Sequence, residues 1–306
     1  MRVILLGPQR RPTVDAAVRA LSLSGPGLSG PVATVTAGWQ EREPDDAELT
    51  AHVGGQAVNL ALYRRWLDVQ ERDPEYLAGA RALADVLAEL QEVYLLRLDY
   101  ALRAVHALQR RPASGDAVQD AVAAVRVLDT GHLRRVNGAR LEFFDRLRPH
   151  DRPVIAAHRA EVADVLGEAS ALVVAGGHVG VLAEVLHLFN LAAVARSPVI
   201  AWSAGAMALT DRIVLFHDRA PQGPGHPEVY GSGLSLLRDA VLLPHARARL
   251  LMDDTPRMGV FARRFAPARC VPLEAGTRID VAADGAWPPG VRVLGENGHV
   301  TVREAA

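Results

Sequence analysis

The chain has 306 residues, of which 49% are hydrophobic and 23% charged, with a formal net charge of −1. This balance is typical of a folded globular protein of one large or two ordinary domains, and it excludes a disordered chain and one whose overall charge attracts nucleic acid or an anionic membrane. No apolar run reaches the length of about 18 residues that a membrane span needs, and the apolar start Val3–Leu6 is too short for the core of a secretion signal. We therefore expect a cytoplasmic protein with no nucleic-acid or membrane partner.

All 34 basic residues are arginine, which excludes a Schiff-base lysine and a P-loop of the Walker type. The single cysteine, Cys270, excludes an internal disulfide and a four-cysteine zinc site. It lies in an apolar segment without a glycine turn, so we expect a buried strand residue rather than a nucleophile. The histidines lack the close spacing of metal ligands, so we expect no metal and no cofactor.

Residues 1–55 form the first part of a predicted α/β core. Apolar strands are expected at Val3–Leu6 and Val32–Thr36, and a helix between Pro44 and Gly54. Trp39–Glu43 follow the second strand, at the sheet edge where open α/β folds bind ligands. Two roles stay open for this segment: lining a pocket, with Trp39 as the candidate, or capping the next helix.

Residues 56–168 are predicted to be an all-helical insertion. The clearest helix runs from Glu75 to Arg110, with an apolar stripe from Leu83 to Leu108 at spacings of three or four residues, and Asp116–Leu128 and Ala139–Leu147 repeat the pattern. Such stripes must be buried against other helices or another chain. We expect a bundle beside the sheet, part of it buried in a homodimer, that serves as a lid or as an oligomer interface.

Residues 169–306 return to alternating strands and helices. Continuous apolar strands separated by helices indicate a mostly parallel, doubly wound sheet that is covered on both faces. The expected strands are Ala171–Val174, Pro198–Trp202, Ile213–Phe216 and Ala240–Leu243, followed by a C-terminal hairpin of Val291–Leu294 and His299–Val302.

The sequence Val199–Met207 is a strand that runs through Trp202-Ser203-Ala204-Gly205-Ala206 into a helix. This order of elements is typical of a nucleophile elbow, whose tight turn presents a serine and needs small neighbours. Ala201 stands where the first glycine of such elbows is usual. The competing interpretation is an ordinary strand-to-helix turn that happens to contain a serine.

A second strand, Leu172–Val174, ends in Gly176-Gly177-His178 before a helix. Paired glycines at this place free backbone N–H groups to face a bound oxygen, as an oxyanion hole requires. The same glycines also permit nucleotide binding, but the GxGxxG spacing and a following acidic residue for the ribose are missing.

These motifs, followed by Gly231–Leu237 and Leu243-Pro244-His245, resemble the dipeptidase E and cyanophycinase family of serine peptidases. The resemblance covers roughly residues 1–54 and 169–280, and it implies a class I glutamine amidotransferase-like fold. No part of the family matches the helical insertion. Serine at the elbow, where the amidotransferase relatives carry cysteine, disfavours glutaminase chemistry.

The resemblance implies Ser203 as the nucleophile and His245 as its general base. The backbone N–H of Ala204, with one from Gly176 or Gly177, would form the oxyanion hole. Such a pair is chemically sensible, because a serine needs an adjacent base to attack a carbonyl and a third group orients the imidazole.

Two carboxylates are candidates for the group that orients the imidazole of His245. The resemblance implies Asp218, with Glu274 as its rival, and an exposed loop carboxylate is the other interpretation of Asp218. Arg247 and Arg249 follow the histidine at a spacing that departs from cyanophycinase, and their guanidinium groups suit a substrate carboxylate or are simply solvated. His178 and Trp202 complete the expected substrate-binding residues.

The sequence therefore predicts a serine hydrolase that cleaves a peptide or amide bond in a small substrate. The alternative is a catalytically inert member of the same family that acts as a binding or assembly protein.

Overall fold

A central sheet organises the chain in the computed structural model, which describes residues 1–9, 13–23, 30–54, 56–111, 115–219 and 225–303. The sheet has six strands, all parallel except β10 at one edge. In sheet order they are β10 (Arg278–Val281), β1 (Val3–Leu6), β5 (Val199–Trp202), β4 (Ala171–Val174), β2 (Val32–Val35) and β3 (Ala57–Asn59). The predicted mixed α/β fold with a largely parallel sheet is confirmed.

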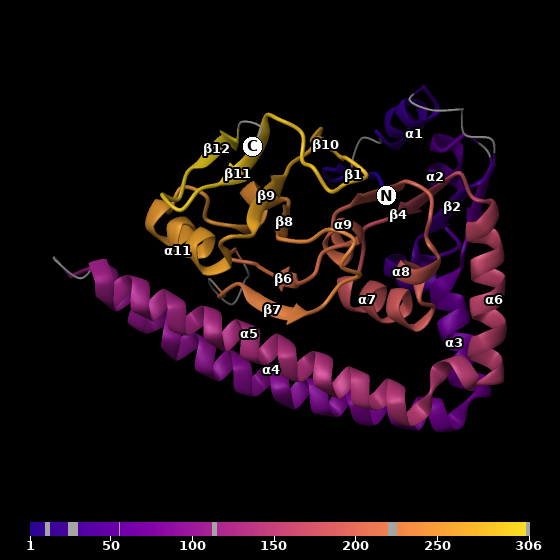
Figure 1. Cartoon of the computed structure of the whole chain (residues 1–306), viewed down its shortest axis with the longest axis horizontal. Helices are drawn as coiled ribbons and strands as arrows, with labels where there is room; N and C mark the ends of the chain where they lie inside the picture. The colour runs from indigo at the N-terminus through magenta and orange to yellow at the C-terminus, as the bar shows by residue number, and fades with distance from the viewer. Residues whose placement is uncertain (10–12, 24–29, 55, 112–114, 220–224, 304–306) are drawn as a thin grey trace.

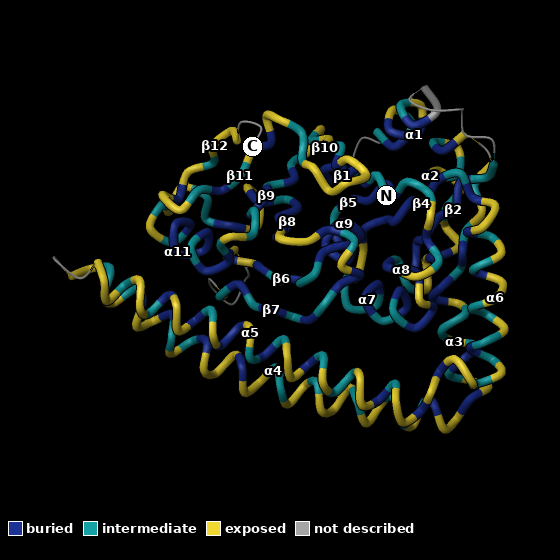
Figure 2. The backbone as a smooth tube through the Cα atoms, viewed as in Figure 1, coloured by how far each residue is buried: buried dark blue, intermediate teal, exposed yellow. Residues whose placement is uncertain are grey.

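Helices cover both faces of this sheet, because its inner strands are apolar at every position except the buried Thr34 of β2. Along β1, Ile4 and Leu6 pack with α1 (Val14–Leu23) and α2 (Ala47–His52), whereas Val3 and Leu5 face the core on the opposite side. Burial is accordingly complete along β1, β2, β4 and β5 (Figure 2). The opposite face is covered by α7 (Val179–Leu188), α8 (Leu191–Val194) and α9 (Ala204–Ala208).

Two further groups of strands lie beside the central sheet (Figure 1). A four-stranded sheet has the order β12-β11-β9-β8, and β6 (Ile213–Leu215) pairs with β7 (Glu228–Gly231) in an antiparallel ribbon. The predicted C-terminal hairpin is present. Their apolar sequences placed Ala240–Leu243 and Ile213–Phe216 in the central sheet, but neither segment joins it. The remaining elements of this half are β8 (Ala240–Pro244), α10 (Ala246–Arg249), α11 (Thr255–Phe265), β9 (Arg269–Leu273), β11 (Val291–Leu294) and β12 (Val300–Arg303).

The expected all-helical insertion differs from its prediction in two ways. Its first residues form β3, which extends the central sheet, and its two predicted helices after Asp116 are one continuous helix, α5. That helix continues past Gly131 and Gly138 because two residues between them, His132 and Val136, are buried and anchor this part of the helix. The helices of the segment are α3 (Leu62–Arg72), α4 (Pro74–Gln109), α5 (Gly115–Leu147) and α6 (Pro153–Glu168), with a short 3-10 helix at Pro149–Asp151; a second 3-10 helix, Ala37–Arg42, follows β2.

The antiparallel pair α4 and α5 runs along one side of the whole molecule (Figure 1). Its start is fixed locally, because the Asp73 carboxylate accepts a hydrogen bond from the Tyr76 N–H at 3.0 Å and Pro74 occupies the first turn. Tyr94, Leu98 and Val105 of the predicted stripe are buried within the chain. The stripe that we expected to contact a second copy is therefore largely covered by the protein itself.

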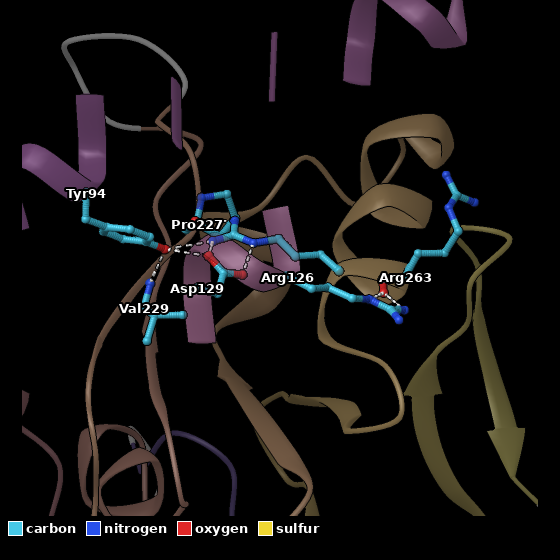
Figure 3. A network of polar contacts seen from close by, with 7 residues as sticks. Tyr94, Arg126, Asp129, Pro227, Val229 and Arg263 are labelled. Atoms are coloured by element: carbon cyan, nitrogen blue, oxygen red, sulfur yellow. Dashed lines mark hydrogen bonds and ion pairs between the residues drawn. The ribbon is translucent and has the colours of Figure 1, made fainter. Parts of the chain in front are cut away.

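A buried polar network fastens this pair to the rest of the protein (Figure 3). Arg264 of α11 donates to both carboxylate oxygens of Asp129 in α5, at 2.7 and 2.8 Å, and to the Tyr94 hydroxyl in α4 at 2.9 Å. The same hydroxyl accepts from the Val229 N–H at 3.0 Å, and the Pro227 carbonyl accepts from Arg264 at 2.6 Å. Near it, the Arg126 guanidinium donates to the Arg263 carbonyl. Both long helices are thus held to α11 and β7 by bonds that water does not reach.

No helix in the described ranges is long and apolar enough to cross a membrane.

Candidate active site

Ser203 occupies the turn between β5 and α9 in a backbone conformation that side-chain-bearing residues rarely adopt. Its φ is 50° and its ψ is −126°. Such a conformation costs about 1 to 3 kcal/mol and persists only where the surrounding structure imposes it. Here α9 is packed directly against the end of β4, and this packing imposes the conformation. The approach is so close that a Cβ built on Gly205 would lie 2.4 Å from the Val174 carbonyl oxygen. This is the geometry of a nucleophile elbow.

The glycine turn after β4 lies against this serine. A Cβ built on Gly176 would be 2.8 Å from the Ser203 Cβ and 3.5 Å from its Oγ. Gly177 has a φ of +133°, and a side chain there would collide with the Gly38 carbonyl, which accepts a hydrogen bond from the His178 N–H at 2.7 Å. Within the described ranges, the N–H groups of Gly176, Gly177 and Ala204 donate no hydrogen bond, so they remain able to serve a ligand oxygen.

His245 reaches the same region from the second sheet. It follows β8, with a left-handed φ of 57°, and its N–H donates to the Leu273 carbonyl at 3.1 Å. Ser203 and His245 both line a cavity of about 940 Å³. The carboxyl ends of β5 and β8, in two different sheets, thus meet at one cavity.

The cavity has an apolar side and a polar side. Leu95 and Leu98 of α4 and Leu215 and Phe216 at the end of β6 supply apolar walls. The titratable groups that line it, besides His245, are His217, His226, Glu228 and Arg249. Burial raises the pKa of Glu228 and lowers the pKa of His226, in each case because an apolar surrounding disfavours the charged form.

Both candidate acids are engaged around α10, the short helix that follows His245. The Asp218 N–H donates to the Arg249 carbonyl at 2.7 Å, and its carboxylate accepts from the Leu251 N–H at 3.1 Å and from Arg257. Glu274 accepts from the Arg247 N–H at 2.8 Å. Both carboxylates brace the helix that carries the histidine.

The expected substrate-binding residues divide into two groups. Trp39, Trp202 and Arg249 line the cavity. His178 and Arg247 do not: His178 caps α7, where its Nδ1 accepts from the Val181 N–H at 3.2 Å, and both side chains are exposed.

The segment after β2 lines a pocket, one of the two roles left open for it, and it caps a helix, but that helix is α3 and not the next helix, α2. Trp39 lines the large cavity and also a second one of about 440 Å³, which shares Gln9, Gly177 and Trp202 with the first. Glu43 caps α3, because its two carboxylate oxygens accept from the N–H groups of Tyr63 and Arg64, each at 2.9 Å.

Some cavity residues were not anticipated from the sequence. Gln9 follows β1 and could have been found from the rule that parallel strands end at one edge. Leu95 and Leu98 carry no such signal, because only the packing of α4 against the core brings them to Ser203. His226 precedes β7 and Glu228 begins it, and no sequence pattern linked this strand to the site.

Cys270 is a buried residue of β9, as expected, and burial raises the pKa of its thiol to about 12. Among the residues that the structure describes, no group of three or more potential ligands is arranged to hold a metal ion.

Comparison with known proteins yields little. No family model matches the chain, and no curated protein matches it. Among solved structures, the crystal structure of a peptidase from an acI-B1 Actinobacterium resembles it with a TM-score of 0.47 and 11% sequence identity, over 100% of this chain and 94% of that chain. We draw no functional conclusion from a likeness this distant.

Proposed function

We propose that the protein is a serine hydrolase that cleaves a peptide or amide bond in a small substrate. The observation that carries this proposal is the strained backbone of Ser203 at a strand-to-helix turn, facing a cavity that His245 also lines. A conformation this costly is typical of sites where a side chain must be presented in one orientation.

The chemistry proposed for the site uses two steps. His245 accepts the Ser203 hydroxyl proton while Oγ attacks the substrate carbonyl carbon, and the oxygen that becomes negative accepts hydrogen bonds from the N–H of Ala204 and of Gly176 or Gly177. The protonated imidazole then gives its proton to the leaving nitrogen as the C–N bond breaks. Water, deprotonated by His245, attacks the acyl carbon; the bond from that carbon to Oγ then breaks, and the imidazolium returns its proton to Ser203.

The acids enter this proposal as positioning residues. Glu274 and Asp218 hold the two ends of α10, so either carboxylate fixes the backbone from which His245 projects. The order of motifs in the sequence supports the dipeptidase E and cyanophycinase family, and with it the class I glutamine amidotransferase-like type of fold. The family, the type of fold and a cytoplasmic location all belong to this proposal.

A binding protein without hydrolytic activity is the second candidate. The Asp218 carboxylate favours it, because Arg257 and a backbone N–H already use both oxygens. A carboxylate committed in this way is less available to orient an imidazole, which is the task of the acid in a catalytic triad.

A fluorophosphonate probe separates the two candidates, because only an activated serine is labelled. We expect labelling of the wild-type protein at Ser203 and none in Ser203→Ala. Ser235→Ala is the matched control, since Ser235 also has a positive φ of 55° but does not line the cavity. Wild-type protein that stays unlabelled would overturn the hydrolase and leave the binding protein.

A further inference from the structure

The side of α4 that faces away from the rest of the molecule carries large apolar side chains. Val86, Val93, Leu96 and Tyr100 are 47%, 52%, 62% and 66% exposed. Figure 2 shows this outer side of α4 as mainly exposed along its length. They differ from the predicted stripe, of which Tyr94, Leu98 and Val105 are buried against the protein itself.

The exposed residues follow a strict pattern. Together with Glu89, which lies between Val86 and Val93, their positions alternate between steps of three and four residues, which keeps them on one narrow face of the helix, as in the seam of a coiled coil. We call this set the outer seam of α4; it consists of Ala82, Val86, Glu89, Val93, Leu96, Tyr100, Arg103 and Ala107, all of them exposed.

The two charged residues of the outer seam lie at equal distances in sequence from Leu96, near its centre. Glu89 lies seven residues before Leu96 and Arg103 seven residues after it. Among the flanking exposed residues, Asp85 and Glu92 lie before Leu96 and Arg97 lies after it, whereas Arg81, beside Ala82, is a basic residue in the acidic half. Asp99, in the basic half, is paired with Arg103 within the chain at 2.8 Å.

This arrangement is complementary to itself under a two-fold axis. If two copies of α4 lie antiparallel with their Leu96 residues near the axis, Glu89 of each copy falls beside Arg103 of the other, and the apolar residues meet between them. A parallel pairing would instead place Glu89 beside Glu89 and Arg103 beside Arg103. From Ala82 to Ala107 the seam is about 39 Å long, enough for a continuous helix–helix contact.

We propose that the outer seam of α4 is a homodimer interface, in which α4 packs antiparallel against α4 of a second copy of this chain. Exposed apolar residues in a continuous row mark an interaction surface, and the mirrored charges identify the partner as the same sequence. The interface lies on the opposite side of α4 from Leu98, so it leaves the cavity beside Ser203 open.

Sedimentation velocity at micromolar concentration tests the interface first. We expect a species of twice 32.8 kDa for the wild type and a monomer for Leu96→Asp. The matched control is Val302→Asp, which changes an equally exposed residue, 64% accessible, on β12 and should stay dimeric. Wild-type protein that remains monomeric would overturn the proposal.

Charge reversal then tests the antiparallel arrangement. Glu89→Arg alone and Arg103→Glu alone should each weaken dimerisation by about tenfold, since each places like charges together at both contacts. An equimolar mixture of the two variants should dimerise again, because each of the two contacts in the mixed pair then joins one arginine to one glutamate. Circular dichroism should show unchanged helix content in Leu96→Asp and in both charge-reversal variants. Single reversals that dimerise like the wild type, or a mixture that stays monomeric, would contradict this interface.

Discussion

Arg257 donates hydrogen bonds to both oxygens of the Asp218 carboxylate, from Nη2 to Oδ1 at 2.6 Å and from Nε to Oδ2 at 3.1 Å. The Asp218 side chain is fully buried, and that of Arg257 is only 16% exposed. The residue that sequence resemblance implied as a catalytic acid is therefore one half of a buried ion pair between the loop after β6 and α11.

We expect Asp218→Ala to lower the free energy of unfolding by about 3 kcal/mol, because it leaves the Arg257 guanidinium without its buried partner. Chemical denaturation measures the loss. The control is Asp211→Ala, whose partly exposed pair with Arg212, at 3.7 Å, should contribute much less. Should Asp218→Asn instead keep its stability and shift the pH profile of hydrolysis, the carboxylate would be the orienting acid after all.

A second prediction concerns Ser203 and His245 as a unit. With a substrate in hand, Ser203→Ala and His245→Ala should each reduce kcat by about a thousandfold or more, and the double variant should lose little beyond either single one. The reason is that neither group can perform its step without the other. Independent, additive losses would mean that the two residues do not act on the same bond.

The local parts of this site were predictable from the sequence. The small residues around Ser203 and the paired glycines at positions 176 and 177 are required by close backbone contacts, and close contacts leave a direct trace in residue type. The order of strands and helices indicated the parallel sheet for the same reason, since burial on both faces demands continuous apolar runs.

The parts that depend on distant packing could not be predicted. The apolar residues of β8 are compatible both with a strand of the central sheet and with the observed pairing to β9, so the sequence does not distinguish the two arrangements. Nothing local to Asp218 shows that Arg257 will neutralise it. Leu95 and Leu96 are neighbours in sequence, yet one lines the cavity and the other points outward, a distinction that only the placement of α4 decides.

The network around Arg264 should be essential for holding α4 and α5 to the core. Arg264→Met should cost about 3 to 5 kcal/mol of unfolding free energy, because the buried Asp129 carboxylate loses its ion-pair partner and keeps only the hydrogen bond from the Tyr94 hydroxyl. Arg264→Met combined with Asp129→Leu should cost less than the sum of the two single changes, since no unpaired charge remains. Arg19→Met, at an exposed pair with Asp15, is the control. Strict additivity in denaturation experiments would show that the two charges do not interact.

Glu228 makes stability depend on pH in a defined direction. Burial raises its pKa above the ordinary value of 4.5, so the folded protein binds the proton more tightly than the unfolded chain. Its favourable contribution is therefore complete below pH 4.5 and is lost as the pH rises through the higher folded-state pKa. Relative to the wild type, Glu228→Gln should gain stability at neutral pH and gain none in acid, as followed by denaturation at several pH values. The control is Glu142→Gln, at an exposed glutamate of α5, which should leave stability unchanged at both neutral and acidic pH. Equal gains for Glu228→Gln at every pH would exclude titration as the cause.

The wall that α4 contributes to the cavity should set the size of the substrate. Leu95 lines the cavity and is 37% exposed, so a larger side chain there can enter the open space without disturbing the core. In the hydrolase proposed above, Leu95→Trp should reduce kcat/KM for bulky substrates by about tenfold or more and should leave the smallest ones nearly unaffected, because the indole removes room rather than a catalytic group. Val127→Trp makes a comparable change on α5, at a position that is 74% exposed and does not line the cavity, and should have no effect on either. Fluorophosphonate labelling of Ser203 gives an independent readout, and a small probe should label both variants at the wild-type rate. Loss of labelling in Leu95→Trp would mean that the substitution had disturbed Ser203 itself. In that case α4 would support the nucleophile rather than the fit of the substrate.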